Sequence, residues 1–194
     1  MIAKAVLVSY ILQVAQLVAA YCEKDRLAAL KRDAEIYTKI SDVPAEAWQP
    51  KPGQPLAIVV SSMPKPSQAW AEAWAAAVID APMFAGNEKY EIAFGLVWAE
   101  KESNYNDNAV GDGGKSFCSF QVSTYWGHSG DALMKSPSLC IYTARGMMRQ
   151  SFKINPMHPM SAYAGSPTHP KAIAISDARN QLVKQVALVL PDIK

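Results

Sequence analysis

The chain has 194 residues, of which 50% are apolar, 9% aromatic and 19% charged. This composition supplies enough apolar residues for the core of one domain, and it excludes an intrinsically disordered chain and a coiled coil. The 19 Lys and Arg residues are scattered among 17 Asp and Glu residues, for a net charge of +2. Since nucleic-acid binding requires clustered basic residues, we expect no nucleic-acid partner.

The first 22 residues carry a single charge, at Lys4, followed by an apolar stretch that Gln13 and Gln16 dilute. The stretch falls short of the roughly 20 apolar residues of a confident membrane span. A short positive start, an apolar middle and small residues at 18–20 predict a secretory signal peptide or a weak membrane anchor over 1–22. The alternative is an ordinary helix of the folded protein.

Residues 23–66 combine a charged segment with a proline-rich one. Residues 23–39 are charged and favour a helix. Six prolines lie between residues 43 and 67. Because proline fixes φ and lacks an amide donor, they predict an extended arm, with one short strand at 56–60.

From residue 67 onward the apolar spacing is helical, so we expect a mainly α domain over 67–194 with little strand. Ser67 is a candidate N-cap for a first helix that ends before Pro82, and Asn87 for a second helix that runs toward Ser103. The second helix is apolar on almost every side and is expected to be central and buried. The pattern further predicts a polar loop at 104–116, a short strand or hairpin at 117–125, and helices at 138–152 and 171–190.

The second helix ends in two carboxylates, Glu100 and Glu102, and a glycine-rich polar loop follows. A carboxylic acid held against apolar side chains has its charged form desolvated, so its pKa rises and it can act as a general acid. The alternative is a solvated last turn, in which both glutamates lie in water beside Lys101.

A series of motifs begins at this acid. Glu102-Ser103 is followed by Tyr105, by Asn106-Asp107-Asn108-Ala109-Val110, by three glycines and by Ser119-Phe120-Gln121; further on stands Ser161-Ala162-Tyr163-Ala164-Gly165. In this order the motifs resemble the signature of the lytic transglycosylases, which are peptidoglycan-cleaving enzymes of the lysozyme-like superfamily. The resemblance covers roughly residues 67–185.

The resemblance implies a lysozyme-like α+β domain with a small β-hairpin, preceded by an N-terminal helix and a Pro-rich arm. It implies cleavage of the β-1,4 bond between N-acetylmuramic acid and N-acetylglucosamine, with formation of 1,6-anhydromuramic acid and with Glu102 as the general acid/base. It places Ser103, Gln121 and Tyr163 in a cleft that binds peptidoglycan glycan strands, and it implies no cofactor and no metal. Trp126, in the loop beyond Gln121, is a further candidate for stacking on a sugar.

Two alternatives to this activity remain. Asp112 or Asp107, both in the glycine-rich loop, could hold a water opposite Glu102, and the enzyme would then be a lysozyme-type muramidase that hydrolyses the same bond. Asp112 otherwise serves to form the turn between glycines. A non-catalytic peptidoglycan-binding component of a secretion or phage assembly would keep the fold without turnover.

The three cysteines, Cys22, Cys118 and Cys140, fit either three buried free thiols or one bridge with a leftover thiol. Two residues depart from the family pattern: Cys118 stands where Gly is usual, and Ala164 where Asn is usual.

Peptidoglycan lies outside the inner membrane, so the implied activity requires export to the periplasm or cell envelope, or storage before phage lysis. The N-terminal segment would then be the contact with a membrane or envelope assembly. An oxidising compartment favours a Cys118–Cys140 disulfide.

Two other signals carry less weight. Residues 109–116 approach a phosphate-binding loop, but neither an apolar strand before them nor a helix after them is expected. His128, His158 and His169 match no metal-ligand spacing.

Overall fold

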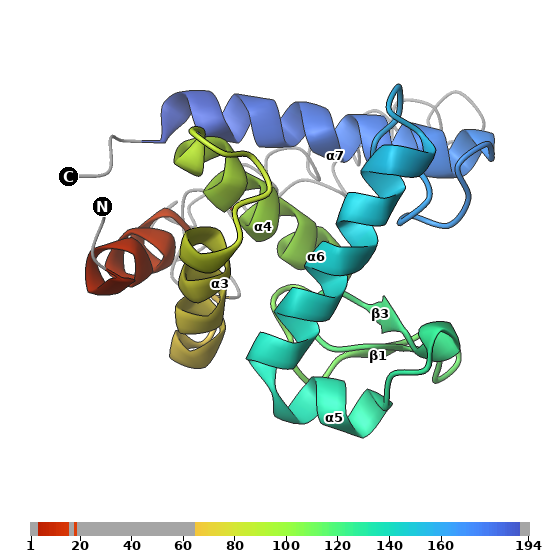
Figure 1. Ribbon diagram of the computed structural model, residues 1–194, viewed down its shortest axis with the longest axis horizontal. Coiled ribbons are helices and arrows are strands. Elements are labelled where there is room, and N and C mark those ends of the chain that lie inside the picture. The colour runs from red at the N-terminus through yellow and green to blue at the C-terminus, as the bar shows by residue number, and fades with distance from the viewer. Residues whose placement is uncertain (1–3, 16–17, 19–64, 191–194) are drawn as a thin grey trace, which may run out of the picture.

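The computed structural model describes residues 4–15, 18 and 65–190 (Figure 1). The predicted charged helix at 23–39, the proline-rich arm with its strand at 56–60, and Cys22 lie outside the described residues.

The described part of the chain is mostly helical and carries one small sheet, which confirms the prediction of a mainly α protein. Residues 4–15 form an N-terminal helix, and the helices that follow are α3 (Gln68–Asp80), α4 (Glu88–Ser103), α5 (Gly130–Lys135), α6 (Pro137–Ile154) and α7 (Pro170–Val189). A 3-10 helix, η2 (Thr124–Trp126), follows the sheet.

The sheet has three antiparallel strands of two residues each, in the order β1 (Val110–Gly111), β2 (Ser116–Phe117) and β3 (Val122–Ser123). Val110 pairs with Phe117, and Phe117 in turn pairs with Val122. The hairpin predicted at 117–125 is present as β2 and β3, and β1 extends it into the region predicted as loop. The sheet and α5 lie together at one end of the molecule, next to the start of α6 (Figure 1).

Both predicted N-caps are confirmed. The Ser67 hydroxyl accepts a hydrogen bond from the Trp70 amide at 3.0 Å, and the Asn87 side chain accepts one from the Tyr90 amide at 3.2 Å. These bonds satisfy amide groups that the first turn of a helix leaves without partners. The last two helices begin at a proline, where the missing amide costs nothing.

Helix α4 is central and buried, as predicted. Its residues from Ile92 to Ala99 are inaccessible to solvent, and α3 and α7 pack against it (Figure 1). Gly95 allows the close approach of α3, because a Cβ at this position would lie 2.1 Å from a ring carbon of Trp74. Trp74, Trp70 and Phe120 form a stacked aromatic cluster with ring centroids 5.7 to 5.9 Å apart, which joins α3 to the segment before β3.

One ion pair is buried in this core. Arg145 of α6 contacts Glu91 of α4 at 2.6 Å, and each side chain is only 1% exposed. The Glu91 carboxylate also accepts hydrogen bonds from the amides of Met83 and Phe84, and Arg145 donates to the Ala77 carbonyl. The pair therefore fixes α4, α6 and the end of α3 relative to one another.

We expect Arg145→Met to lower the free energy of unfolding by about 3–5 kcal/mol, because the Glu91 carboxylate would remain buried without its cation. Urea denaturation of the two proteins measures the difference. Arg149→Met is the matched control, since Arg149 is only partly buried and donates to the Ala81 carbonyl at the same helix end. Equal losses in the two variants would contradict a special role for the buried pair.

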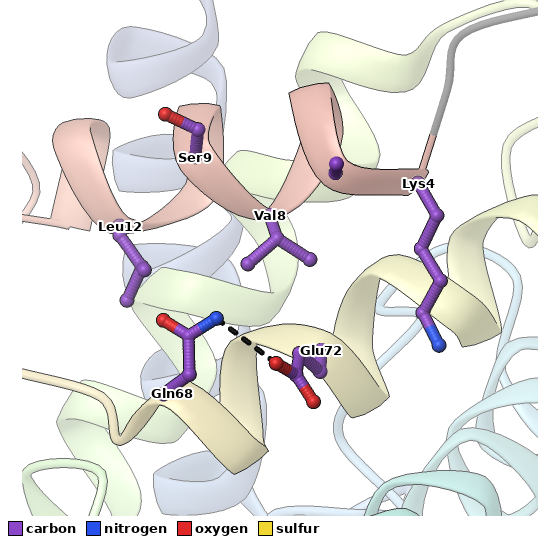
Figure 2. A pocket seen from close by; sticks show the side chains of 7 residues that line it. Lys4, Val8, Ser9, Leu12, Gln68 and Glu72 are labelled. Carbon is purple, nitrogen blue, oxygen red and sulfur yellow. Dashed lines mark hydrogen bonds between the residues drawn. The ribbon is translucent and has the colours of Figure 1, made fainter.

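The N-terminal helix packs on the domain. Leu7, Ile11, Val14 and Ala15 are at most 2% exposed and belong to the same core as α3 and α4. An open groove of about 670 Å³ separates this helix from α3. Figure 2 shows its wall, with Val8 and Leu12 facing Gln68 and Glu72 of α3.

This packing gives residues 4–15 the character of an ordinary helix of the folded protein, the alternative considered from the sequence. No helix in the described ranges is both long and apolar enough to cross a membrane. A signal or anchor role for residues 1–22 stays a prediction.

If the N-terminal helix is part of the stable fold, Ile11→Ala is expected to lower the free energy of unfolding by about 2–5 kcal/mol, the usual effect of truncating a buried Ile. Ser9→Ala, on the exposed side of the same helix, should change it by less than about 0.5 kcal/mol. Chemical denaturation of the full chain measures both. An Ile11→Ala protein as stable as the control would show that the helix does not contribute to the fold.

Candidate active site

Glu102 lies in the last turn of α4, at the point where the buried helix reaches the polar loop. Asn104 ends the helix in the left-handed conformation, with φ of 55°, and its amide bonds to the Ala99 and Glu100 carbonyls. The non-glycine residues with positive φ in the described ranges all fall within residues 104–121: Asn104, Tyr105, Asp112, Cys118 and Gln121. Such conformations cost energy and occur often at functional sites.

The Glu102 side chain is 18% exposed, and its carboxyl is contacted by the Arg179 guanidinium of α7. Burial raises the pKa of Glu102, Arg179 opposes this through its charge and hydrogen bond, and the negative charge of Asp112 raises the pKa further. The net effect is a pKa above the ordinary value for glutamate. Glu102 therefore holds its proton to a higher pH than a solvated glutamate does, as a general acid requires.

Glu100, the second carboxylate considered from the sequence, has a different environment. It lies 3.9 Å from the Lys101 ammonium, and its side chain is 15% exposed. The two glutamates are thus distinguished by their partners: Glu100 has a neighbour on its own helix, whereas Glu102 is held by a helix distant in the sequence.

Ser103 and Gln121 both bond to the backbone of the segment between β2 and β3. The Ser103 hydroxyl donates to the Ser119 carbonyl at 2.8 Å and accepts from the Asn106 amide at 3.0 Å. The Gln121 amide group donates to the Cys118 carbonyl at 3.1 Å. Gly111 lies directly under Gln121, since a Cβ there would be 2.0 Å from Gln121 Oε1.

Tyr163 lies in the segment between α6 and α7 and packs on α4. Its hydroxyl donates to the Phe120 carbonyl at 2.6 Å, and its ring packs edge-on against Trp98 at 5.9 Å. Burial raises the pKa of Tyr163 well above its usual value, and the nearby Glu102 carboxylate raises it further, while Arg179 lowers it. The structure thus brings Tyr163 within electrostatic reach of Glu102, although the tyrosine hydroxyl bonds to a backbone carbonyl.

The two aspartates proposed as second carboxylates lie in different places. Asp112 is exposed in the β1–β2 turn, where it accepts a hydrogen bond from Ser116 at 2.5 Å, and it acts on the pKa of Glu102. Asp107 accepts a hydrogen bond from Ser67 at 3.2 Å and so anchors the loop to the start of α3. Burial raises the pKa of Asp107, and hydrogen bonds from Ser67 and Ser119 oppose the shift. Of the two, Asp112 is the one coupled to Glu102.

A cavity of about 420 Å³ opens beside Tyr163, along α6. Its wall includes Tyr142, Met147, Gln150 and His128. Trp126, the candidate for sugar stacking, is the last residue of η2, one residue before the turn that leads to His128.

The histidines lie at separate places. His128 lines that cavity, His158 contacts Asp177 at 2.8 Å, and His169 caps α7 by accepting from the Lys171 amide. Within the described ranges, no three residues of the His, Cys, Asp and Glu types are grouped as a metal site requires.

Cys118 and Cys140 form a disulfide that joins the segment between β2 and β3 to α6. Both cysteines are inaccessible to solvent. Cys118 has φ of 64°, a conformation that suits glycine better than a residue with a side chain. The disulfide holds the backbone of this residue next to Ser119, whose hydroxyl accepts a hydrogen bond from Trp70 at 2.9 Å.

Peptide mapping without reductant should recover Cys118 and Cys140 in one cross-linked peptide. Reduction should lower the free energy of unfolding by about 3 kcal/mol, the value expected for a loop of this size, since the two cysteines are 22 residues apart. A Cys140→Ser variant is the control, because its stability should not respond to reductant. Free thiols at both positions in protein produced under oxidising conditions would contradict the pairing.

Arg179 is the site residue that the sequence analysis missed. It lies 77 residues after Glu102, in a helix with no motif of its own, so no local signal points to it. Only the packing of α7 on α4 brings the two side chains together.

The chain matches no protein-family model, no curated protein and no solved structure. The arrangement around Glu102 is therefore the basis for a functional assignment, together with the motifs of the sequence.

Proposed function

We propose that this protein is a peptidoglycan lytic transglycosylase with a lysozyme-like α+β domain. The observation that carries the proposal is the environment of Glu102, whose carboxyl lies at the end of a buried helix, has a raised pKa and borders a polar loop with unusual backbone conformations. The motifs from Glu102 to Gln121 and around Tyr163, which resemble those of the lytic transglycosylases, support the same assignment.

In the proposed reaction Glu102 first acts as an acid. It transfers its proton to the glycosidic oxygen between N-acetylmuramic acid and N-acetylglucosamine as the bond to the anomeric carbon breaks. The ionised Glu102 then accepts the proton of the muramic acid 6-hydroxyl, whose oxygen bonds to the anomeric carbon. The product is a 1,6-anhydro sugar, no water is consumed, and one carboxyl serves both steps.

The other site residues have supporting roles in this proposal. Gln121 and Ser103 shape the loop beside Glu102 and are the candidates for contacts with substrate amides. Tyr163 packs on Trp98 behind the acid and helps to orient it. Cys118 stands where glycine is usual in lytic transglycosylases, and its left-handed backbone fits that position.

The position of Asp112 favours one second candidate function, a muramidase that hydrolyses the same bond. A hydrolase needs a second carboxylate to activate a water or to stabilise charge across the cleft. Asp112 is exposed to water and lies close enough to raise the pKa of Glu102. Its hydrogen bond to Ser116 ties it to the turn, which favours the transglycosylase over the hydrolase.

The substrate lies outside the cytoplasmic membrane, so the proposal includes delivery to the periplasm or cell envelope, or release during phage lysis. The disulfide supports an oxidising compartment. The N-terminal segment is the proposed address or membrane contact.

Glu102→Gln should lower the rate of peptidoglycan clearing by at least about 100-fold, because general acid catalysis contributes about 10²–10⁴-fold. Binding to insoluble peptidoglycan should persist, since the amide keeps the shape of the carboxyl. Zymography and a turbidity assay on purified walls measure activity, and co-sedimentation measures binding. Glu100→Gln is the matched control from the same helical turn and should keep most of the activity.

Clearing by Glu102→Gln at the wild-type rate would overturn the assignment. A wild-type protein that sediments with walls but never clears them would instead support a non-catalytic binding component. Mass spectrometry of the digest separates the two chemistries, because anhydro ends indicate a transglycosylase and reducing ends indicate a hydrolase.

A further inference from the structure

Arg179 of α7 contacts the last turn of α4 at two points. One guanidinium nitrogen, Nη1, donates to Glu102 Oε1, and the other, Nη2, donates to the Lys101 carbonyl at 3.4 Å. The Arg179 and Glu102 side chains are each 18% exposed, so solvent screens this contact only in part. The contact therefore connects the two helices at the proposed acid.

The Arg179 guanidinium is also held by the indole ring of Trp98. It lies 4.7 Å from the centre of the Trp98 ring, which is inaccessible to solvent. Trp98 is itself held by Asn180, which accepts a hydrogen bond from its indole at 3.4 Å, and by the edge-on ring of Tyr163. Since a cation over an indole ring is attracted to its face, Arg179 has a preferred position that does not depend on Glu102.

A guanidinium has hydrogen-bond donors and no acceptor. The carbonyl oxygen of a protonated carboxyl is a better hydrogen-bond acceptor than its hydroxyl oxygen. Protonation of Glu102 with this contact intact therefore favours Oε1 as the carbonyl oxygen and Oε2 as the oxygen that carries the proton. Among the described residues, the hydrogen bond to the Glu102 carboxyl comes from Arg179, and it is made to Oε1.

We propose that Arg179 is a positioning residue of this site: by holding Oε1 of Glu102 it assigns the transferable proton to Oε2. The proposal rests on the function proposed above. In the acid step the Oε2–H bond breaks and the proton passes to the glycosidic oxygen as the anomeric C–O bond breaks. In the second step the 6-hydroxyl proton returns to Oε2 as the new C–O bond forms. Arg179 transfers no proton in either step and serves only as a hydrogen-bond donor to Oε1.

Charged and titratable groups face Glu102 from each neighbouring element. They are Arg179 from α7, Asp112 from the β1–β2 turn and Tyr163 from the segment before α7. On α4 itself, Glu100 and Lys101 precede Glu102 and pair with each other. Burial and the charge of Asp112 raise the pKa of Glu102, and the charge and hydrogen bond of Arg179 lower it. Loss of the guanidinium therefore removes the downward shifts, and the pKa of Glu102 should rise.

A titration tests the proposal without turnover. The full chain labelled with ¹³C-glutamate is titrated by NMR, and the Glu102 carboxyl signal is assigned by its loss in Glu102→Gln. In Arg179→Gln this carboxyl should titrate at higher pH than in the wild type. Lys184→Gln, which removes one positive charge from the exposed side of the same helix, should titrate like the wild type. Equal titration of Glu102 in Arg179→Gln and the wild type would overturn the proposal.

Kinetics on soluble glycan strands then separate positioning from mere stability. Arg179→Gln should lower kcat about 10–100-fold, because a misplaced acid loses orientation, and should leave KM within about threefold, since Arg179 contacts the acid and not the glycan. In the pH profile of kcat for Arg179→Gln, the alkaline limb should move to higher pH, because the pKa of Glu102 should rise. Arg179→Lys keeps the positive charge, so the alkaline limb of its pH profile should stay at the wild-type pH. It loses the planar guanidinium and its two donor groups, so kcat should still fall.

Wild-type kcat in both Arg179 variants would overturn the proposal. If Arg179→Gln fails to fold by circular dichroism, Arg179→Lys decides: lower kcat with an unmoved limb supports positioning, and wild-type kcat contradicts it. A wild type that cleaves no glycan would refute the proposed function, while the titration would still decide whether Arg179 controls the protonation of Glu102.

Discussion

A helix that is apolar on almost every side must be covered on every side, and α4 sets this constraint for the whole molecule. The faces of α4 are covered by α3 and α7, and α6 packs on α3. At its first turn the one buried charge of α4, Glu91, is neutralised by Arg145 of α6. The packing of α3, α6 and α7 thus serves two needs of α4: it shields the apolar faces of this helix from water, and it supplies the cation that pairs with Glu91.

The same burial shifts the pKa of a carboxyl at the other end of α4. Where the helix leaves the core, the environment that covers Trp98 also removes water from Glu102 and raises its pKa. The loop that follows is anchored by short contacts rather than by regular structure: Ser103 to the Ser119 carbonyl, Asp107 to Ser67, and the disulfide to α6. Glu102 therefore lies where the stable core ends and a loop with energetically costly backbone conformations begins.

Features encoded locally could be predicted from the sequence. The N-caps Ser67 and Asn87, the burial of α4 and the position of Glu102 follow from residue types within one or two helical turns. The partners of the buried charges could not be predicted in this way. Arg145 and Arg179 lie 54 and 77 residues from the glutamates that they contact, and only helix packing decides which arginine meets which acid. The roles of Asp107 and Asp112 were likewise separated only by the path of the loop.

The burial of the N-terminal helix bears on the proposed role of this segment as an address. Its apolar side, which includes Leu7 and Ile11, is covered by the domain in the folded protein. A surface that is covered by protein is not available to a membrane or to a translocation channel at the same time. If this segment serves as the proposed address, its recognition must precede the packing of residues 4–15 on the domain, because both use the same face of the helix.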